Sequence, residues 1–538
     1  MTKSRTRKCW SCKQRRLKCD GGLPHCLKCW SHGVECLGYK KPLVWVDGVA
    51  RRGPMKNRTF GDAQTQPLSQ RPSLQGSTSV ISQGQHHQNE QLTKASGGIP
   101  MPVALVEPLF KDLSYTSRFF IDYFSNCICP TLVLQDLSNN PYRNVIPWIN
   151  TPTVASAIMT ISSCHYIQYV TNCPMAELLP QTRNGAVLSA LSKPVLGSLN
   201  TRSGSIVNYY LRSKSHCLGL VSAALARHRT TQDQQSLLIT VVLLAFLDIF
   251  ESGSGAWSYH IEGIKKMLEV GAMTGTSSSD NNLQNLLHEA AILQIFGSSL
   301  AKPGVLTSAS TLSSMRTPAF STITPIGCPI EILSTIEIFA SQRRHDFVFA
   351  EHTTNIAVLE DALHRLRSYD IVSWAMHNTT EVSKVSSEDL VRLGTIWQLS
   401  ADIYACRILA CLTGCSLTSE SLQVQDLIAE YAFLEREDDE LIKCLIWPTF
   451  IAGAASTTYE TRAWVLKTLD RIWNTGHCAN TKNAANVLGK LWEKYDQTNP
   501  SSSHTYGTSH ATEYSSMGYS AWDWLKELSS LEGSWLFM

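Results

Sequence analysis

Hydrophobic positions recur at helical spacing along most of this chain. Over residues 105–538, large apolar side chains return every three or four residues, which places them on one face of a helix. Strict alternation of apolar and polar residues, the pattern of a half-buried strand, is scarce. The spacing is clearest in Trp257–Leu268, Ile330–Ala340, Ile396–Leu412, Trp464–Trp473 and Val487–Tyr495. The pattern predicts one large all-α domain over residues 105–538.

The strongest apolar run is Leu237–Leu247, and a long apolar helix can either cross a membrane or lie buried in a protein core. The run stops at Asp248 and is shorter than the roughly 18 apolar residues that a span requires. The N-terminus is rich in Lys and Arg and has no apolar signal segment. We therefore expect a buried helix in a soluble, intracellular protein with no membrane partner.

Residues 61–104 have a different composition from the rest of the chain. They are rich in Gln, Ser, Gly, Thr and Pro and poor in large apolar residues, which predicts a disordered linker. No heptad repeat of apolar residues is present, so the sequence predicts no coiled coil. The oligomeric state is left open between a monomer and pairing through the large domain.

Charge is distributed unevenly between the two ends of the chain. Residues 1–60 contain 15 Lys and Arg against 3 Asp and Glu, a formal charge of +12, whereas the whole chain carries +3. The remaining residues therefore carry −9. A basic N-terminal segment favours a polyanionic partner such as nucleic acid.

Six of the 17 cysteines fall in one short segment with the spacing C-x2-C-x6-C-x6-C-x2-C-x6-C. Two tetrahedral zinc ions need eight ligand positions, so two of six thiolates must bridge both ions. Symmetry between the halves assigns the bridges to Cys9 and Cys26. So short a segment with few aliphatic residues is expected to be unfolded without zinc. The expected ligands are Cys9, Cys12, Cys19, Cys26, Cys29 and Cys36.

Two other interpretations fit these cysteines less well. A disulfide framework is typical of secreted chains, which this N-terminus does not resemble. A mononuclear zinc finger would use His25 or His32, but it would leave the regular six-cysteine spacing unexplained. We therefore expect both histidines to lie at the surface.

With the basic run Lys13–Lys18, the Cys19-Asp20 pair and Pro24, the segment resembles the binuclear zinc cluster of fungal transcription factors. The resemblance implies a Zn2Cys6 DNA-binding domain over residues 1–38, double-stranded DNA as partner, and the nucleus as location. Residues 37–60, which include a basic extension over 39–60, resemble the stretch that follows the cluster in the branch that includes the acriflavine sensitivity control protein.

DNA contacts are expected from the first helix of the cluster. The core of the cluster is metal, so the side chains of this helix cannot pack inward and face solvent and the DNA groove. Arg15, Arg16 and Lys18 are the candidates for base reading, because Arg and Lys match the O6 and N7 acceptors of guanine. The resemblance implies a CGG triplet, with Arg16 where the family has its main reading lysine. Lys28, in the second half, is expected to contact phosphate.

Five stretches of the large domain carry a second resemblance: Phe119–Phe124, Asn140–Arg143, Trp257–His260, Cys328–Leu333 and Trp447–Gly453. They resemble the second type of fungal-specific transcription factor domain. This resemblance implies a regulator of RNA polymerase II promoters, with the transcription machinery or coactivators as partners. In the branch named above, the targets are often a biosynthetic or detoxification gene cluster. A small-molecule effector inside the helices is compatible with this domain.

The rival hypothesis is a helical enzyme or metabolite sensor that uses a zinc cluster for targeting. Phosphate-binding, nucleophile-elbow, zinc-protease and dinucleotide motifs are absent from the sequence. His260 lies on the same helical stripe as Trp257 and Ile264, so we expect a structural role. The sequence therefore predicts that the chain is not an enzyme. Three cysteines of the large domain are expected to pack in its core: Cys406, Cys411 and Cys415.

The last segment, residues 521–538, mixes Trp and Leu with acidic residues. That composition suits an activation segment that docks on a coactivator. Trp522, Leu525 and Leu528 also recur at helical spacing, and the chain ends in an apolar tail that is unfavourable in water. We expect packing against the large domain.

Overall fold

The structure is a computed structural model that describes residues 8–20, 26–32, 34, 36, 113–137, 140–178, 201–227, 230–273, 281–306, 323–343, 356–379, 385–415, 420–434, 440–499 and 522–538. The chain divides into two compact units, residues 1–111 and 112–538. The expected basic extension, 39–60, and linker, 61–104, lie outside the described residues.

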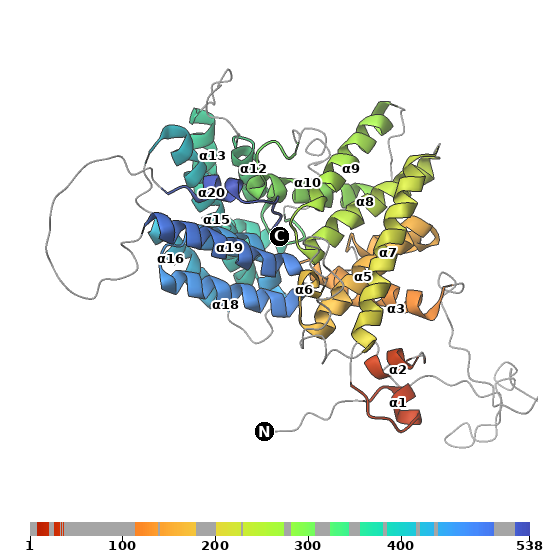
Figure 1. The fold of residues 1–538 in the computed structure, drawn as a ribbon. Helices are drawn as coiled ribbons and strands as arrows, with labels where there is room; N and C mark the ends of the chain where they lie inside the picture. The colour runs from red at the N-terminus through yellow and green to blue at the C-terminus, as the bar shows by residue number, and fades with distance from the viewer. Residues whose placement is uncertain are drawn as a thin grey trace, which may run out of the picture. The chain divides into compact units, whose positions relative to one another are not determined.

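The first unit contains two one-turn helices, α1 (Trp10–Gln14) and α2 (Leu27–Ser31), drawn in red in Figure 1. They contact one another. The buried core of this unit consists of the six cysteine side chains, with Leu17 packed against them. A core without aliphatic side chains gains little from the hydrophobic effect, so another interaction has to stabilise the unit.

The described residues of the second unit are mostly helical, as the hydrophobic spacing predicted. Among its described residues the only β interaction is an isolated bridge between Ile323 and Pro329. Each of the five segments with clear helical spacing lies within one helix. These helices are α9 (Ala256–Met273), α12 (Ile330–Ala340), α15 (Ser387–Thr413), α18 (Tyr459–Gly476) and α19 (Ala479–Thr498).

The first half of this unit packs around α5. That helix lies against both α7 and α8, and α8 lies against α9 (Figure 1). The remaining elements are α3 (Tyr115–Tyr123), η3 (Phe124–Ile128), α4 (Cys129–Thr131), η4 (Arg143–Asn150), α5 (Pro152–Thr171), α6 (Met175–Leu178), α7 (Thr201–Leu225), α8 (Thr231–Glu251) and α10 (Asn281–Leu300).

The second half packs around α17 (Ile446–Ala454), of which all nine residues are buried. Trp447 stacks on Trp397 of α15, with 5.8 Å between ring centroids, and donates a hydrogen bond to Ser299 Oγ at 2.9 Å. The other elements are α13 (Ile356–Ser368), α14 (Ile371–Asn378), α16 (Glu420–Tyr431), η6 (Ala432–Leu434), η7 (Glu440–Cys444) and α20 (Trp524–Ser530).

Helix α8 contains the apolar run considered above as a membrane candidate. By length and composition alone, Gln232–Glu251 is apolar enough to cross a membrane, but 83% of it is buried inside the protein. Core helices of soluble proteins have the same character. The prediction of a buried helix is confirmed.

The C-terminal segment packs into the large domain. Trp524, Leu528 and Phe537 are fully buried, and Phe537 lies 4.6 Å from the Phe450 ring of α17. Trp257 Nε1 donates a hydrogen bond to the carbonyl oxygen of Ser534 at 3.1 Å. The structure supports packing, because an activation segment would have to withdraw these side chains from the core.

The expectation that Cys406, Cys411 and Cys415 pack in the core of the large domain is wrong. Cys415 is exposed, because it follows Gly414, which ends α15 in a left-handed conformation with φ +70°. Cys406 and Cys411 are half-buried beside polar groups. The Arg367 guanidinium donates to Cys406 Sγ at 3.1 Å, and Cys411 Sγ donates to the Asp523 carboxylate at 3.0 Å.

Candidate metal centre and nucleic-acid interface

The six cysteine sulfurs form two sets of four, and within each set the Sγ atoms lie within 4.8 Å of one another. Both sets contain Cys9 and Cys26, the residues expected to bridge. Tetrahedral zinc with Zn–S bonds of about 2.3 Å places ligand sulfurs about 3.8 Å apart. The Sγ of Cys26 lies 3.4 Å from that of Cys9 and 3.6 Å from that of Cys12, and Cys9 Sγ lies 3.7 Å from Cys29 Sγ. The donor set fits a two-zinc cluster.

Backbone N–H groups point at the sulfurs in the same way in both halves. The N–H of Cys12 donates to Cys9 Sγ at 3.3 Å, and the N–H of Cys29 donates to Cys26 Sγ at 3.3 Å. The N–H of Cys9 also donates to Cys19 Sγ, at 3.4 Å. The equivalent bond in the second half joins the N–H of Cys26 and Cys36 Sγ at 3.5 Å. N–H donors stabilise the negative charge that sulfur carries as a thiolate.

Burial opposes that charge when no cation is bound. It raises the pKa of the Cys9, Cys26 and Cys29 thiols above the ordinary value. Zinc ligation requires thiolates, so metal binding at this site releases protons. Bound zinc would therefore offset the rise in thiol pKa that burial causes.

Asp20 connects the two halves through its carboxylate. It accepts hydrogen bonds from the N–H of Leu27 at 2.9 Å and of Lys28 at 3.0 Å, the first residues of α2. A carboxylate at a helix N-terminus satisfies donors that have no partner within the helix. The sequence suggested Asp20 only as part of a family resemblance, and its capping role appears in the structure.

Arg16 has an unusual backbone conformation at the end of α1. Its φ is +53°, in the left-handed region that favours glycine. The helix ends here because the N–H of Arg16 bonds to the carbonyl of Lys13 at 3.3 Å and that of Leu17 to the carbonyl of Cys12 at 2.9 Å. At the equivalent sequence position, the second half of the cluster has Gly33. Non-glycine residues in this backbone conformation cluster at functional sites.

The residues expected to read DNA lie on the surface near this turn. Arg15, Arg16 and Lys18 are exposed, and Lys28 of α2 is half-buried. Their exposure leaves the cationic groups accessible to a nucleic acid. His32 is exposed and belongs to neither sulfur set, as expected for a surface residue, and His25 lies outside the described residues.

In the described part of the large domain, no group of His, Cys, Asp and Glu is close enough to hold a metal. Burial, with a contribution from the Lys214 ammonium, lowers the pKa of His260 to about 4. The imidazole is therefore neutral at physiological pH and a weak base, which fits the structural role expected for it.

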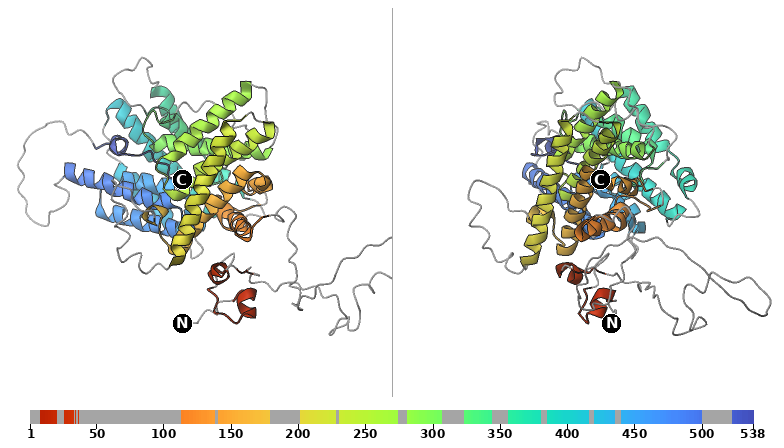
Figure 2. Two further views of the ribbon diagram at one scale, coloured as in Figure 1. Left: turned by 45° about the vertical axis from the view of Figure 1, so that its right-hand side comes forward. Right: turned by 90° about the vertical axis from the view of Figure 1, so that its right-hand side faces the viewer.

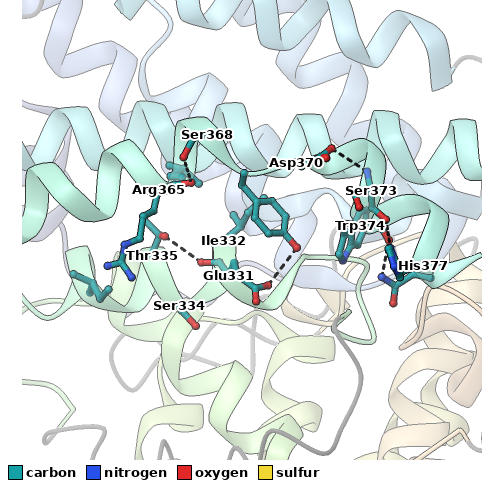
Figure 3. Close-up of a pocket in the computed structure, with 14 residues that line it drawn as sticks. Glu331, Ile332, Ser334, Thr335, Arg365, Ser368, Asp370, Ser373, Trp374 and His377 are labelled. Carbon is teal, nitrogen blue, oxygen red and sulfur yellow. Dashed lines mark hydrogen bonds between the residues drawn. The ribbon is translucent and has the colours of Figure 1, made fainter.

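A groove of about 730 Å³ lies between α12, α13 and α14 (Figure 3). Ile332, Leu366 and Trp374 are the buried apolar side chains that line it. Tyr369 Oη donates to the Glu331 carboxylate across the groove at 3.3 Å, and the Asp370 carboxylate accepts from the N–H of Ser373 at 2.9 Å. Its size suits a small molecule, but these groups form no nucleophile and base pair.

Comparison with known proteins places the two units in one class, the zinc-cluster transcription factors. Residues 7–45 match the fungal Zn(2)-Cys(6) binuclear cluster domain, and residues 118–537 match the fungal specific transcription factor domain. Because the second match covers more than half of the chain, the protein belongs to the fungal Zn2Cys6 transcription factor family. It is a DNA-binding, zinc-binding transcription factor with two zinc ions in its cluster, and not an enzyme.

Two relatives align over nearly the whole chain. The acriflavine sensitivity control protein acr-2 of Neurospora crassa is 21% identical over 92% of this chain and 93% of its own length. The phomenoic acid biosynthesis cluster-specific transcriptional regulator of Leptosphaeria maculans is 22% identical over 91% of this chain and 86% of its own length. The pestheic acid cluster transcriptional regulator 3 of Pestalotiopsis fici is 44% identical over 39 residues, 7% of each chain. No solved structure matches the chain.

Proposed function

We propose that the protein is a nuclear, sequence-specific regulator of RNA polymerase II promoters that reads CGG-type half-sites. In this proposal residues 1–38 bind DNA, 39–60 form a basic extension, 61–104 a linker and 105–538 the regulatory domain. The observation that carries it is the pair of four-sulfur sets sharing Cys9 and Cys26, next to the exposed turn of Arg16. Zinc would make this turn rigid, and the turn would then present its cations to the major groove.

The six cysteines are proposed as the ligands of both zinc ions. Zinc would supply folding free energy here rather than chemistry, because the four sulfurs of each set would fill all positions around a tetrahedral ion. Cys9 and Cys26 would bridge the ions, whereas Cys12, Cys19, Cys29 and Cys36 would each bind one. Asp20 would hold α2 in place against this core.

Metal analysis of residues 1–60 tests the ligand assignment. We expect two zinc ions per chain, and loss of both structure and DNA affinity on chelation, because folding and metal binding are one equilibrium. Cys26→Ser should reduce zinc content and folding more than Cys36→Ser, since it removes a sulfur common to both sets. One zinc per chain, or a metal-free fragment with a native circular dichroism spectrum, would contradict the assignment.

The proposed targets are genes of a secondary-metabolite biosynthetic cluster. Two of the relatives above are named as regulators of such clusters, which supports this part of the proposal. Genome-wide occupancy of the tagged protein tests it. Peaks with CGG sites in one contiguous group of biosynthetic genes are expected, and peaks spread over unrelated promoters would contradict it.

A second candidate function is effector binding in the groove between α12, α13 and α14. Its apolar floor and its mixed charges, Glu331 and Asp370 against Arg365, suit a largely neutral, amphipathic small molecule. Ser334→Trp would fill the groove, and Asn474→Trp on the exposed face of α18 is the control. We expect only the first to change transcriptional output at equal abundance and promoter occupancy. Unchanged output would exclude an effector at this place.

A further inference from the structure

Helix α1, drawn in red in Figure 2, has a tryptophan and a lysine beside one another on its surface. The ammonium of Lys13 lies over the Trp10 ring, 4.5 Å from the ring centroid. A cation within about 6 Å of an indole face is attracted by the π electrons of the ring. The two positions are three residues apart, which places their side chains next to one another on an α-helix. The helix therefore brings the two residues into a cation–π contact.

The sulfur core fixes the direction in which this pair points. Ser11 and Cys12, which lie between the two residues, are buried. The N–H of Cys12 donates to Cys9 Sγ at 3.3 Å, so the first turn of α1 is tied to the cluster. Lys13 is exposed and Trp10 is half-buried. The lysine ammonium is thus held on the solvent side of the helix.

Lys13 also lies close to the turn that is proposed to read DNA. Its carbonyl accepts a hydrogen bond from the N–H of Arg16 at 3.3 Å, so the two residues are one helical turn apart. If Arg16 reaches a base edge in the groove, a cation one turn earlier lies nearer the rim, where the phosphates are. Lysine is suited to phosphate as a compact point charge with three donors.

We propose that Lys13 binds a backbone phosphate and that Trp10 is the positioning residue that holds its ammonium for this contact. The inference rests on the proposed binding of DNA by residues 1–38. A free lysine has many rotamers, and ordering it on a phosphate costs conformational entropy. The Trp10 ring orders the side chain before DNA binds, so less entropy is lost in the complex. The ring covers one side of the ammonium, and the other N–H donors can point at phosphate oxygens.

The second half of the cluster offers an internal comparison. By sequence, Leu27 and Trp30 stand where Trp10 and Lys13 stand in the first half. Leu27 begins α2 and is 37% exposed, so a one-turn helix forms at this place with an aliphatic side chain. An aromatic ring at the equivalent position of α1 is therefore not a requirement of the fold, which favours a role in binding.

Affinities of the full-length, zinc-loaded protein for CGG and scrambled duplexes test the proposal. Lys13→Gln should weaken binding to both duplexes about tenfold at low salt. It should also reduce the slope of log affinity against log salt by about one, because one phosphate contact is lost. Trp10→Leu should weaken binding to both about threefold and leave the slope unchanged, because Lys13 keeps its charge.

A double variant distinguishes positioning from an independent contact of the ring. If Trp10 acts through Lys13, the protein with both Trp10→Leu and Lys13→Gln should bind as Lys13→Gln does. Additive losses would overturn the proposal, because they would mean that the ring stabilises the complex by itself. A Lys13→Gln protein with the wild-type salt slope would overturn the phosphate contact.

Trp10→Phe is the matched control, because it keeps an aromatic face over the ammonium where Trp10→Leu keeps only apolar volume. It should bind more tightly than Trp10→Leu, at wild-type zinc content and melting temperature. If Trp10→Leu loses zinc, Trp10→Phe and Trp10→Tyr replace it. Both should then bind more weakly than wild type, and affinities equal to wild type would overturn the proposal.

Failure of this inference is distinct from failure of the proposed function. A wild-type protein that binds CGG and scrambled duplexes equally would count against CGG reading. The effects of Trp10→Leu and Lys13→Gln are measured on any duplex, so they would still decide whether Trp10 positions Lys13. Wild-type affinity and salt slope in both variants, with the CGG preference intact, would overturn this inference alone.

Discussion

Single residues carry the DNA-reading part of the proposal, and Arg16 is the most informative of them. Its left-handed backbone lies at the end of α1, where the chain turns away from the helix. Arg16→Ala should reduce discrimination between CGG and other duplexes by about 1–3 kcal/mol, the contribution of one base-reading side chain. Competition binding with matched and scrambled duplexes measures it.

Lys28→Ala is the contrasting variant, because a phosphate contact carries no sequence information. It should weaken binding to all duplexes alike and reduce the salt dependence of affinity. An Arg16→Ala fragment that retains its CGG preference but binds every duplex more weakly would show that Arg16 contacts phosphate.

Glu289 gives a pH-dependent prediction at the same scale. It is fully buried and accepts a hydrogen bond from Tyr142 Oη at 2.9 Å, and burial raises its pKa to about 8. The unfolded chain has an ordinary carboxyl pKa, so the protonated side chain favours the folded state, and this stabilisation is lost as pH rises from about 4.5 to 8. Glu289→Gln removes the titration and keeps an acceptor for Tyr142.

Melting temperatures of wild type and Glu289→Gln over pH 5 to 9 measure this effect. We expect the variant to gain stability relative to wild type as pH rises through this range. A constant difference between the two proteins would show that Glu289 has an ordinary pKa in the folded state.

Among the elements, the C-terminal segment closes the large domain by a backbone contact at Gly253. The N–H of Leu536 donates to the carbonyl of Gly253 at 2.9 Å. Gly253 has φ +63°, and a Cβ atom there would lie 2.5 Å from the carbonyl oxygen of Leu536. Gly253→Ala should destabilise the domain by about 2 kcal/mol or more, from the left-handed backbone and the clash together.

Gly255→Ala is the control, because a Cβ atom at Gly255 meets nothing within 4 Å and its φ is not positive. Thermal unfolding followed by circular dichroism should show a lower melting temperature for Gly253→Ala alone. Equal melting temperatures in the two variants would mean that the C-terminal segment contributes little to the stability of the fold.

The sequence predicted elements better than it predicted their contacts. Helical spacing located α9, α12, α15, α18 and α19, because periodicity depends on neighbours within one helix. The hydrogen bond of Tyr142 to Glu289 spans 147 residues and that of Trp257 to Ser534 spans 277, and no local pattern encodes such pairs. Cys415 was misplaced because it lies just beyond the periodic part of α15.

The metal site was the most predictable part of the protein, because the number, the residue type and the spacing of its ligands can be read directly from the sequence. The two sulfur sets and their common members, Cys9 and Cys26, could be anticipated by counting ligand positions. The left-handed turn at Arg16 was not anticipated, since arginine rarely adopts it. The comparison with Gly33 at the equivalent position would have been the signal.

At the scale of the whole molecule, the remaining question is how many chains bind one DNA site. Residues 37–104 contain no heptad repeat of apolar residues, so the isolated N-terminal fragment has no element that pairs in a defined register. A fragment of residues 1–60 should therefore bind a single CGG half-site as one chain. Sedimentation of the fragment with a half-site duplex and with an inverted repeat measures the stoichiometry.

On the inverted repeat, two fragments should bind independently, because nothing in residues 37–60 joins them. Cooperative two-to-one binding by the fragment would show instead that dimerisation arises within residues 1–60.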